Sequence, residues 1–244
     1  MTILIDIGNT SIKKCKLNKG KLYSFKYIDY SKNLTNPIIN FFLEDIKSDE
    51  IFLICSVVPE VTKIIINKFI SKNVDYKIIN KNNFKKIVSP KVNINELGAD
   101  RIINYLGLKY YYPLRKNFLV IDFGTATTID IIVNNIYIGG VILPGLTTSY
   151  KNLVNSASLI NNFQIKPTKL LYGTNTKNAL LSGSFNGYSH MINGYADQLQ
   201  KHFKKKFKKV VTGGHGFIFS KNTKDMEFHK NLTFSGLKYY YENF

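Results

Sequence analysis

The sequence predicts a mixed α/β fold in which two similar lobes enclose a cleft, and two observations support this prediction. The first is an internal duplication, because ILIDIGNTSI at residues 3–12 and LVIDFGTATTI at residues 119–129 share one pattern. Each copy begins with an apolar β-branched run, reaches an Asp, and passes through a hydrophobe and a Gly into small hydroxyl or amide residues. The second observation is that strand-like and helix-like segments alternate along the rest of the chain.

Each copy of the duplicated segment predicts a β-hairpin with an acid at the end of its first strand. Gly followed by Asn or Thr marks the tight turn, and a second strand-like run follows it. The two acids, Asp6 and Asp122, stand nearly half a chain apart. The polar, helix-breaking segment 113–117 separates the copies, so we expect one lobe over residues 1–113 and the other over residues 114–244.

The segments between and after the hairpins complete the expected lobes. Pro59 suits the first position of a helix, because its missing N–H group has no helical partner there. In a later helix, Ile102, Ile103, Leu106 and Tyr110 fall on one face. The expected elements are a strand at 51–55, helices at 59–70 and 96–110, a strand at 137–143, a helix at 174–201 and a strand at 209–212.

The composition fits a globular protein with packed interiors. Of the 244 residues, 44% are hydrophobic, which is enough for one large core or two smaller ones. The longest apolar runs have strand length, far short of the roughly 20 residues that cross a bilayer. Asp6 comes too early for a signal segment, and the separate cysteines Cys15 and Cys55 suit a reducing compartment. We therefore expect a cytoplasmic protein with no membrane partner.

A formal net charge of +18 raises the question of nucleic-acid binding. Arg101 and Arg115 are the only arginines among 34 basic residues, and this lysine bias is typical of an AT-rich genome. The densest cluster, KHFKKKFKK at residues 201–209, is explained by a solvated helix face on which Phe203 and Phe207 pack four residues apart. We therefore expect no nucleic-acid partner.

The stretch DIGNTSIK at residues 6–13 is the first candidate for chemistry. Its Gly-Asn turn exposes backbone N–H groups, and Thr10 and Lys13 add donors, a set that suits phosphate oxygens. The acid at the strand end could hold Mg²⁺ between phosphates. One Asp-x-Gly hairpin is explained equally by a plain turn, but its recurrence at residues 122–128 favours two turns that face one cleft. Neither copy has the glycine spacing of a P-loop or a dinucleotide fold.

The run Gly98-Ala99-Asp100-Arg101 is the second candidate. Asp100 at the start of a helix has a plain structural explanation, because the helix dipole stabilises an acid in the first turn. Arg101 favours a functional explanation, since only a guanidinium offers a planar two-pronged fit to a carboxylate. An Asp beside an Arg could orient a hydroxyl and accept its proton while a phosphate leaves ATP.

Other polar positions have plainer explanations. Asn175 and Thr176 stand near the start of a predicted helix, where N-capping accounts for one of them. The glycine pairs at 139–140 and 213–214 bring the backbone close to a ligand or to neighbouring strands. The four histidines show no metal-ligand spacing, although His215 follows a glycine pair and could border a nucleotide.

Seven strings, in this order, resemble those of the type III pantothenate kinase family. They are DIGNTSIK (6–13), SVVP (56–59), LGADR (97–101), DFGTATTID (122–130), GGVILPG (139–145), GTNTKNALLSG (173–183) and TGG (212–214). The Gly-Ala-Asp-Arg run together with the second Asp-x-Gly hairpin is specific to that family. The first hairpin is shared more widely among actin-like, sugar-kinase and chaperone ATPases.

The resemblance implies duplicated ribonuclease-H-like lobes of the actin-like ATPase kind, with a cleft between them. It also implies a homodimer with its active sites near the interface. The implied activity is transfer of phosphate from ATP to pantothenate, the first step of coenzyme A biosynthesis. Mg²⁺ would accompany ATP, and a monovalent cation, K⁺ or NH₄⁺, would be required.

The resemblance also implies a role for each matching residue. Asp100 would accept the hydroxyl proton, Arg101 would face the carboxylate of pantothenate, and Asp122 would bind the monovalent cation. Gly98, Ala99, Asp100, Arg101 and Thr176 would contact pantothenate. The ATP contacts would be Asp6, Ile7, Gly8, Asn9, Thr10, Ser11, Ile12, Lys13 and Thr125.

One short segment departs from the family pattern. A Tyr and an Asn-Pro pair usually precede the Gly-x-Asp-Arg run, whereas this chain has Lys91 and Ile94 in the Tyr and Pro positions and retains Asn93. Two alternatives to pantothenate phosphorylation stay open, and this departure bears on the first of them. One is a kinase of another small hydroxy compound, and the other is a non-catalytic regulatory protein that binds nucleic acid on the same fold.

Overall fold

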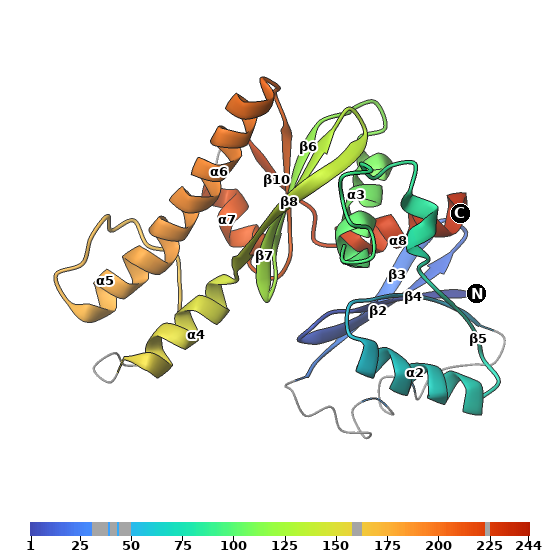
Figure 1. Cartoon of the computed structure of the whole chain (residues 1–244). Coiled ribbons are helices and arrows are strands. Elements are labelled where there is room, and N and C mark those ends of the chain that lie inside the picture. Colours follow the sequence, from blue (N-terminus) through green and yellow to red (C-terminus); the bar gives the residue numbers. More distant parts are fainter. Residues whose placement is uncertain (31–38, 40–42, 44–49, 158–162, 223–224) are drawn as a thin grey trace. The chain divides into compact units, whose positions relative to one another are not determined.

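The computed structural model of the chain describes residues 1–30, 39, 43, 50–157, 163–222 and 225–244 (Figure 1). These residues form two compact units. The first comprises Met1–Arg115, Ile136–Ile138 and Asn231–Phe244, and the second comprises Lys116–Asn135 and Gly139–Lys230. The chain thus passes from one unit to the other within the polar segment 113–117. The C-terminal residues 231–244 group with the first unit, whereas the sequence predicted that they belong to a second lobe over residues 114–244.

The first unit is built on a five-stranded sheet that contains the first predicted hairpin. Its strands are β1 (Thr2–Ile7), β2 (Ser11–Asn18), β3 (Lys21–Asp29), β4 (Ile51–Ser56) and β5 (Asp75–Ile78). They lie in the order β3-β2-β1-β4-β5. Neighbours among β1, β2 and β3 are antiparallel, whereas β1, β4 and β5 run parallel. All six residues of β1, the central strand, are buried, which explains its continuous apolar run.

The second unit repeats this arrangement with the second predicted hairpin. The strands of its sheet are β6 (Phe118–Phe123), β7 (Ala126–Val133), β8 (Ile136–Pro144), β9 (Lys208–Thr212) and β10 (Met226–Phe228). The first three residues of β8 group with the first unit. The order β8-β7-β6-β9-β10 matches that of the first sheet strand for strand. The central strand β6 is again antiparallel to the hairpin partner β7 and parallel to β9. The shared order confirms the predicted fold class of two similar α/β lobes.

Helices cover both faces of the first sheet (Figure 1). Alternate residues of β1, namely Ile3, Ile5 and Ile7, pack with the buried side of α2 (Pro59–Ser71). On the other face lie α3 (Ala99–Tyr111) and α8 (Leu232–Asn243), which contact β4 and β1. As predicted, α2 begins with Pro59 in its first turn.

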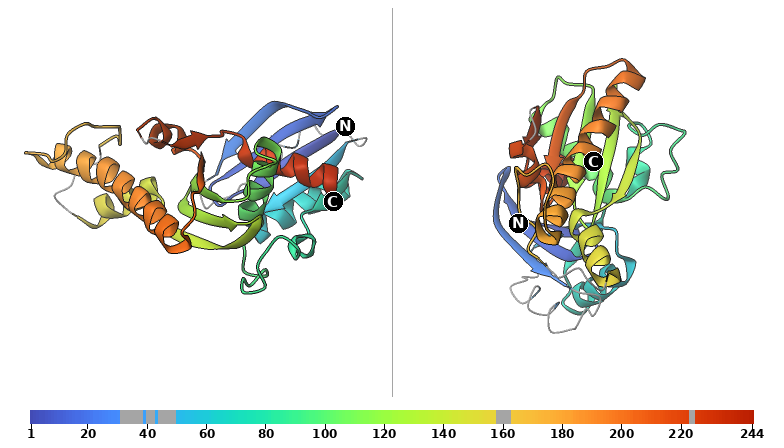
Figure 2. Two further views of the ribbon diagram at one scale, coloured as in Figure 1. Left: turned by 90° about the horizontal axis from the view of Figure 1, so that it is seen from above. Right: turned by 90° about the vertical axis from the view of Figure 1, so that its left-hand side faces the viewer.

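Helices α3 and α8 pack backbone against backbone and lie side by side in Figures 1 and 2. A Cβ atom added at Gly236 would lie 1.8 Å from the carbonyl oxygen of Ile103, and one added at Gly107 would lie 2.5 Å from that of Leu232. Only glycine permits so close an approach. The C-terminal helix therefore fixes the position of the helix that bears Asp100 and Arg101, and this contact explains why residues 231–244 belong to the first unit.

The helices of the second unit are α4 (Leu146–Ser156), α5 (Thr176–Ser182), α6 (Tyr188–Phe203) and α7 (Gly216–Asn222). The sequence predicted one helix over 174–201, but the structure has a π-helical turn at Gly183–Gly187 between α5 and α6. Around this turn, Phe185 stacks on Phe219 of α7 with ring centroids 5.1 Å apart. None of the helices that the structure describes is both long and apolar enough to span a membrane.

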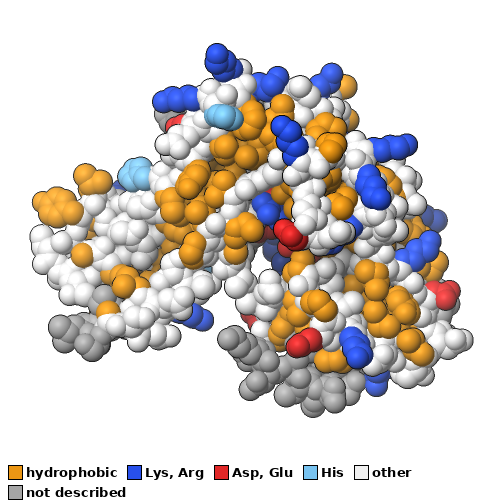
Figure 3. Space-filling model, viewed as in Figure 1, with side chains coloured by type: hydrophobic (Ala, Val, Ile, Leu, Met, Phe, Trp, Pro, Cys, Tyr) orange, Lys and Arg blue, Asp and Glu red, His pale blue; other side chains and the backbone are white. Residues whose placement is uncertain are grey.

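The lysine-rich segment 201–209 has a structural role in the second unit. The segment is not the single helix face that the sequence predicted, because α6 ends at Phe203 and β9 begins at Lys208. Phe207 is nevertheless buried and meets Phe203 edge to face, with ring centroids 6.0 Å apart. Lys208 pairs with Glu227, and the Lys209 ammonium lies 3.4 Å from the Asp197 carboxylate. On the face drawn in Figure 3, the Lys and Arg side chains are scattered rather than gathered in one patch.

The glycine contact between α3 and α8 gives a stability prediction. Gly236→Ala forces the two backbones apart and should lower the free energy of unfolding by about 1–3 kcal/mol. Gly194→Ala in α6 is the matched control, because its added Cβ meets no described heavy atom within 4 Å beyond its own helix. The control should be neutral or stabilise by up to about 1 kcal/mol. Urea unfolding measures both, and equal midpoints would contradict the prediction.

Candidate functional site

The first glycine turn follows β1 at the carboxyl end of that strand. Ile7 still pairs with Ile12, and the Gly8 N–H group closes the turn by donating to the Ser11 carbonyl oxygen at 3.0 Å. Asn9 and Thr10 at the tip are exposed. The tip of the turn therefore lies at the surface, where the predicted phosphate contacts would require it to be.

Asp6 and Lys13 face each other across the base of this turn. They are opposite partners in the antiparallel register, and the Lys13 ammonium lies 3.6 Å from the Asp6 carboxylate. Asp6 is buried, with 8% of its surface exposed, whereas the Lys13 side chain is 45% exposed. Lys13 thus partly balances a buried negative charge while its ammonium stays accessible to a ligand.

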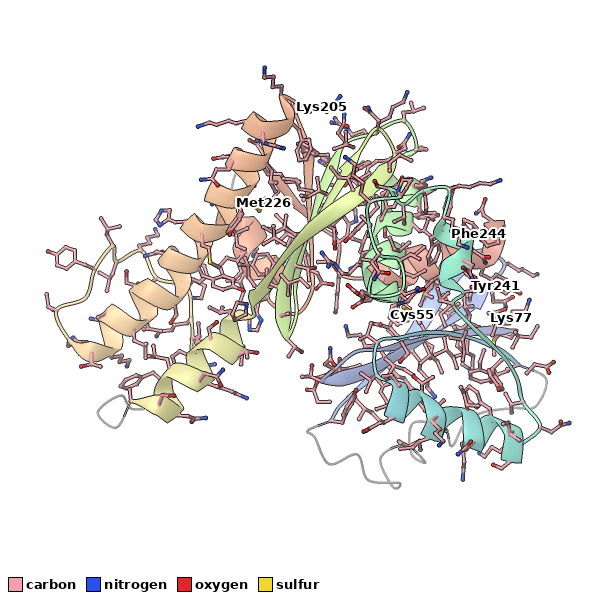
Figure 4. All side chains as sticks on the ribbon, viewed as in Figure 1. Cys55, Lys77, Lys205, Met226, Tyr241 and Phe244 are labelled. Atoms are coloured by element: carbon pink, nitrogen blue, oxygen red, sulfur yellow. The ribbon has the colours of Figure 1, made fainter. Side chains whose placement is uncertain are left out.

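Parallel pairing brings Asp6 and Asp100 to one edge of the first sheet. Asp6 is the partner of Cys55 on β4, and both carboxylates act on the Cys55 thiol, whose pKa is raised well above its ordinary value mainly by burial and further by these two charges. Figure 4 labels Cys55 beside α3. A Cβ atom added at Gly98 would lie 3.6 Å from a methyl group of Val57, the residue that follows β4. In the sequence, the turn that follows Asp6 and the run that contains Asp100 lie about ninety positions apart.

The Asp100 carboxylate folds back over the start of α3. Its Oδ1 atom accepts the Arg101 N–H group at 2.9 Å, and a Cβ atom added at Gly98 would lie only 2.4 Å from that oxygen. Burial raises the pKa of Asp100 above its ordinary range, although the Arg101 N–H group, the Arg101 charge and Lys81 act in the opposite direction. A carboxylate with a raised pKa is a stronger proton acceptor when it is ionised.

Two cations accompany Asp100, and the sequence indicated only one of them. The Arg101 guanidinium lies 6.0 Å above the ring of the buried Tyr137. Lys81, which the sequence did not single out, donates to the Asn95 carbonyl oxygen at 2.9 Å and lowers the pKa of Asp100 through its charge. No sequence signal could have distinguished Lys81, because lysine is so abundant in this chain.

The segment that departs from the family pattern is shaped by Asn93. Its side-chain oxygen accepts the Asn95 N–H group at 3.1 Å, and its side-chain nitrogen donates to Glu96 at 2.7 Å. Its carbonyl oxygen accepts the Leu97 N–H group at 3.2 Å. The retained Asn93 therefore directs the chain into Gly98 by hydrogen bonds of its own.

The second glycine turn has a parallel construction in the second unit. Asp122 pairs with Thr128, and the Gly124 N–H group donates to the Ala126 carbonyl oxygen at 3.1 Å. The Thr125 carbonyl oxygen accepts the Gly145 N–H group at 3.1 Å and the Thr148 hydroxyl at 2.8 Å. The start of α4 thus holds this turn in place.

Asp122 lies against the glycine pair after β9. A Cβ atom added at Gly213 would lie 2.4 Å from the Asp122 Oδ1 atom, and Gly213 has a positive φ of 86°. His215 follows, with its Nε2 atom 3.2 Å from the Thr147 hydroxyl. Burial lowers the pKa of His215 and so favours its neutral ring. No cluster of three or more His, Cys, Asp or Glu side chains that could hold a metal occurs among the described residues.

Thr176 lines an open pocket of about 520 Å³ in the second unit. Asn175 caps the helix that starts there, since its side-chain oxygen accepts the Asn178 N–H group at 2.9 Å. This confirms the expected N-cap and leaves Thr176 exposed. The pocket is lined by Gly173, Thr174, Asn175, Thr176, Ala179 and Leu180.

The sequence model of the type III pantothenate kinase family matches residues 2–198. The chain belongs to the type III pantothenate kinase family. A type III pantothenate kinase from Pelagibacter ubique is 35% identical to it over 246 residues, with 97% of each chain covered.

Solved structures share the fold of this chain. A Campylobacter jejuni protein assigned to the Baf family of transcriptional activators has a TM-score of 0.64 and 26% identity, and the match covers 99% of this chain and 98% of the other. A Sinorhizobium meliloti protein assigned as a 2-dehydro-3-deoxygalactonokinase has a TM-score of 0.61, 12% identity and 97% coverage of both chains. At that identity the second likeness shows the fold alone.

The raised pKa of Asp100 gives a stability prediction for this type III pantothenate kinase family member. The folded state favours the protonated carboxyl, so the stability that this group contributes is fully present below its unfolded pKa and is lost as the pH rises through its folded pKa. Asp100→Asn should therefore unfold at a higher temperature than the wild type at pH 7. The difference should shrink as the pH falls towards about 4.

Thermal unfolding across this pH range measures the effect. The exposed Asp75 on β5 provides the matched control, because Asp75→Asn removes a carboxylate in solvent and should leave the unfolding temperature nearly unchanged. An Asp100→Asn variant that is less stable than the wild type at pH 7 would contradict the prediction.

Proposed function

We propose that this chain transfers the γ-phosphate of ATP to the hydroxyl group of pantothenate. The product is 4′-phosphopantothenate, and the reaction is the first step of coenzyme A biosynthesis. Membership of the type III pantothenate kinase family supports this activity. The structural observation that carries the proposal is the place of Asp100. Gly98, just before Asp100, lies against Val57, and the Val57 N–H group donates to the Ile7 carbonyl oxygen beside the phosphate turn at 3.1 Å.

Asp100 and Arg101 act on the acceptor in this proposal. Asp100 takes the proton from the pantothenate hydroxyl as its oxygen attacks the γ-phosphorus, and the bond from that phosphorus to ADP breaks. Arg101 pairs with the pantothenate carboxylate, for which a guanidinium has the right planar shape. Gly98 and Ala99 border the same substrate. Arg101 thus orients the acceptor, and the Asp100 carboxylate holds its proton.

The two glycine turns bind ATP in this proposal. The first turn offers its N–H groups and the Lys13 ammonium to phosphate oxygens, and Thr125 belongs to the second turn. Mg²⁺, bound with ATP, would neutralise phosphate charge, and Asp6 is the carboxylate of the first turn that is suited to hold it directly or through water. The contacts of the first turn are Asp6, Ile7, Gly8, Asn9, Thr10, Ser11, Ile12 and Lys13.

Asp122 is the proposed ligand of a monovalent cation, K⁺ or NH₄⁺. Its carboxylate, which lies against the backbone of Gly213, offers oxygen atoms as ligands for such an ion. The cation would supply positive charge beside the second turn. Thr176 is proposed to contact pantothenate.

The kinase is also proposed to act as a cytoplasmic homodimer. The family resemblance supports both the cytoplasmic location and the homodimer, and the expected substrates are intracellular. The name of the Campylobacter jejuni relative concerns that protein, and on the face drawn in Figure 3 the Lys and Arg side chains do not form a single patch. A substrate panel with an ADP-coupled readout tests the activity, and turnover of another hydroxy compound in preference to pantothenate would overturn the substrate assignment.

Replacing the proposed base gives the most direct test of the mechanism. Asp100→Asn should lower kcat by about 10²–10⁴-fold, the usual contribution of a general base, while ATP binds as in the wild type. In the wild type, kcat should fall in acid as the pH drops through the raised pKa of Asp100, above the range of an ordinary Asp. Steady-state kinetics measure both effects. Asp75→Asn should keep full turnover, and normal turnover in Asp100→Asn would remove this residue from the mechanism.

The cation site gives a separate prediction. Asp122→Asn should abolish the increase in activity that K⁺ or NH₄⁺ produces over a large organic cation, because the ligand loses its charge. Titration of KCl at constant ionic strength with the ADP-coupled readout measures this dependence. Asp197→Asn on the exposed face of α6 should keep the wild-type dependence. Equal activation in the Asp122 variant would contradict the assignment.

A further inference from the structure

A tyrosine outside every matching string holds the first glycine turn. Tyr30 follows β3, and its ring is buried in the core with Ile7 and Ile12. Its hydroxyl donates to the Gly8 carbonyl oxygen. Its backbone N–H group donates to the Thr10 carbonyl oxygen at 2.9 Å. One residue therefore contacts both sides of the turn tip from a fixed position in the core.

The Tyr30 hydroxyl sets the direction of a backbone donor. In a trans peptide the C=O and N–H groups point to opposite sides. Because Tyr30 fixes the Gly8 carbonyl on the core side, the N–H group of Asn9 must point away from the core. Asn9 is exposed, so this donor faces the solvent side of the turn, where a phosphate would approach.

A second tyrosine holds the second turn through one peptide group. The Tyr188 hydroxyl lies 2.9 Å from the Pro144 carbonyl oxygen and 2.5 Å from the Thr127 hydroxyl. A carbonyl oxygen can only accept, so the Tyr188 hydroxyl donates its one proton to the Pro144 carbonyl oxygen. The Thr127 hydroxyl therefore donates to the Tyr188 oxygen. The N–H group of the same Pro144–Gly145 peptide donates to the Thr125 carbonyl oxygen at 3.1 Å.

The consequence for Thr125 is the same as for Gly8. Its carbonyl is fixed towards Gly145, so the N–H group of the next residue, Ala126, points to the opposite side. Gly145 cannot be replaced without disturbing this contact, since an added Cβ would lie 2.3 Å from the Thr125 carbonyl oxygen. Tyr188 thus orients the second turn from α6, through the Pro144–Gly145 peptide.

We propose that Tyr30 and Tyr188 are positioning residues for ATP, each of which fixes the direction of a backbone N–H donor in one glycine turn. The inference rests on the proposed ATP role of the two turns. Neither tyrosine needs to touch the nucleotide, since each acts through a peptide group. Burial raises the pKa of both phenols, with the Asp6 charge adding to the effect at Tyr30, so both hydroxyls keep their protons at neutral pH.

Tyr30→Phe and Tyr188→Phe test the proposal, because each keeps the ring and removes only the hydroxyl. Each variant should bind a non-hydrolysable ATP analogue about fivefold more weakly, the effect of one hydrogen bond. The KM for ATP should rise by about the same factor, while the KM for pantothenate and kcat change by less than about twofold. Isothermal titration calorimetry needs no acceptor, so it stays informative even if pantothenate is not the substrate.

Tyr150→Phe is the matched control. Its hydroxyl is also held in a partly buried contact, with the backbone of Phe163, and no described hydrogen bond joins it to either turn. The control should lower the unfolding temperature as much as the test variants do and leave ATP binding unchanged. A normal affinity in either test variant would remove that tyrosine from the proposal. Equal weakening in all three variants would assign the effect to general stability and overturn it.

Discussion

The parallel pairing of β1 with β4 is the constraint on which the site of the first unit depends. It sets Asp6 beside Cys55 and holds the residue after β4 against the last residue of β1, since the Val57 N–H group donates to the Ile7 carbonyl oxygen at 3.1 Å. Parallel strands place their carboxyl ends at one edge, where α/β folds bind ligands. The glycine turn and the start of α3 both reach this edge. A loss of this register would separate the phosphate turn from the acceptor residues.

Charge balance at this edge explains why buried carboxylates are tolerated. Asp6 is buried and Asp100 is half-buried, and the loss of water around a carboxylate favours its neutral form. Lys13 offsets the first charge, while Arg101 and Lys81 act on the second. The balance at Asp100 remains incomplete, because its pKa is still raised. The raised pKa makes the ionised Asp100 carboxylate a better proton acceptor, whereas it does not help the stability of the fold.

The sequence predicted the elements whose pattern is local. The two hairpins, α2 with Pro59 in its first turn and the body of α3 follow from apolar runs, turn residues and helical spacing. The sequence missed β3, whose residues are mostly exposed and show no clean alternation. It also missed α8, where the buried Lys238 obscured the apolar face. The single helix predicted over 174–201 overlooked the π-helical turn, because an extra residue in a helical turn leaves the spacing almost unchanged.

By itself, the sequence determined the duplicated hairpins, the acids that end their first strands and the Gly-Ala-Asp-Arg run, because residue type fixes turn chemistry and charge over a few positions. Only the tertiary structure decided which distant residues meet these motifs. Lys81, Tyr30 and Tyr188 carry no distinctive local pattern, and the crossing of Gly107 and Gly236 joins segments more than a hundred positions apart. Such contacts depend on strand order and helix packing, which only the folded chain as a whole specifies.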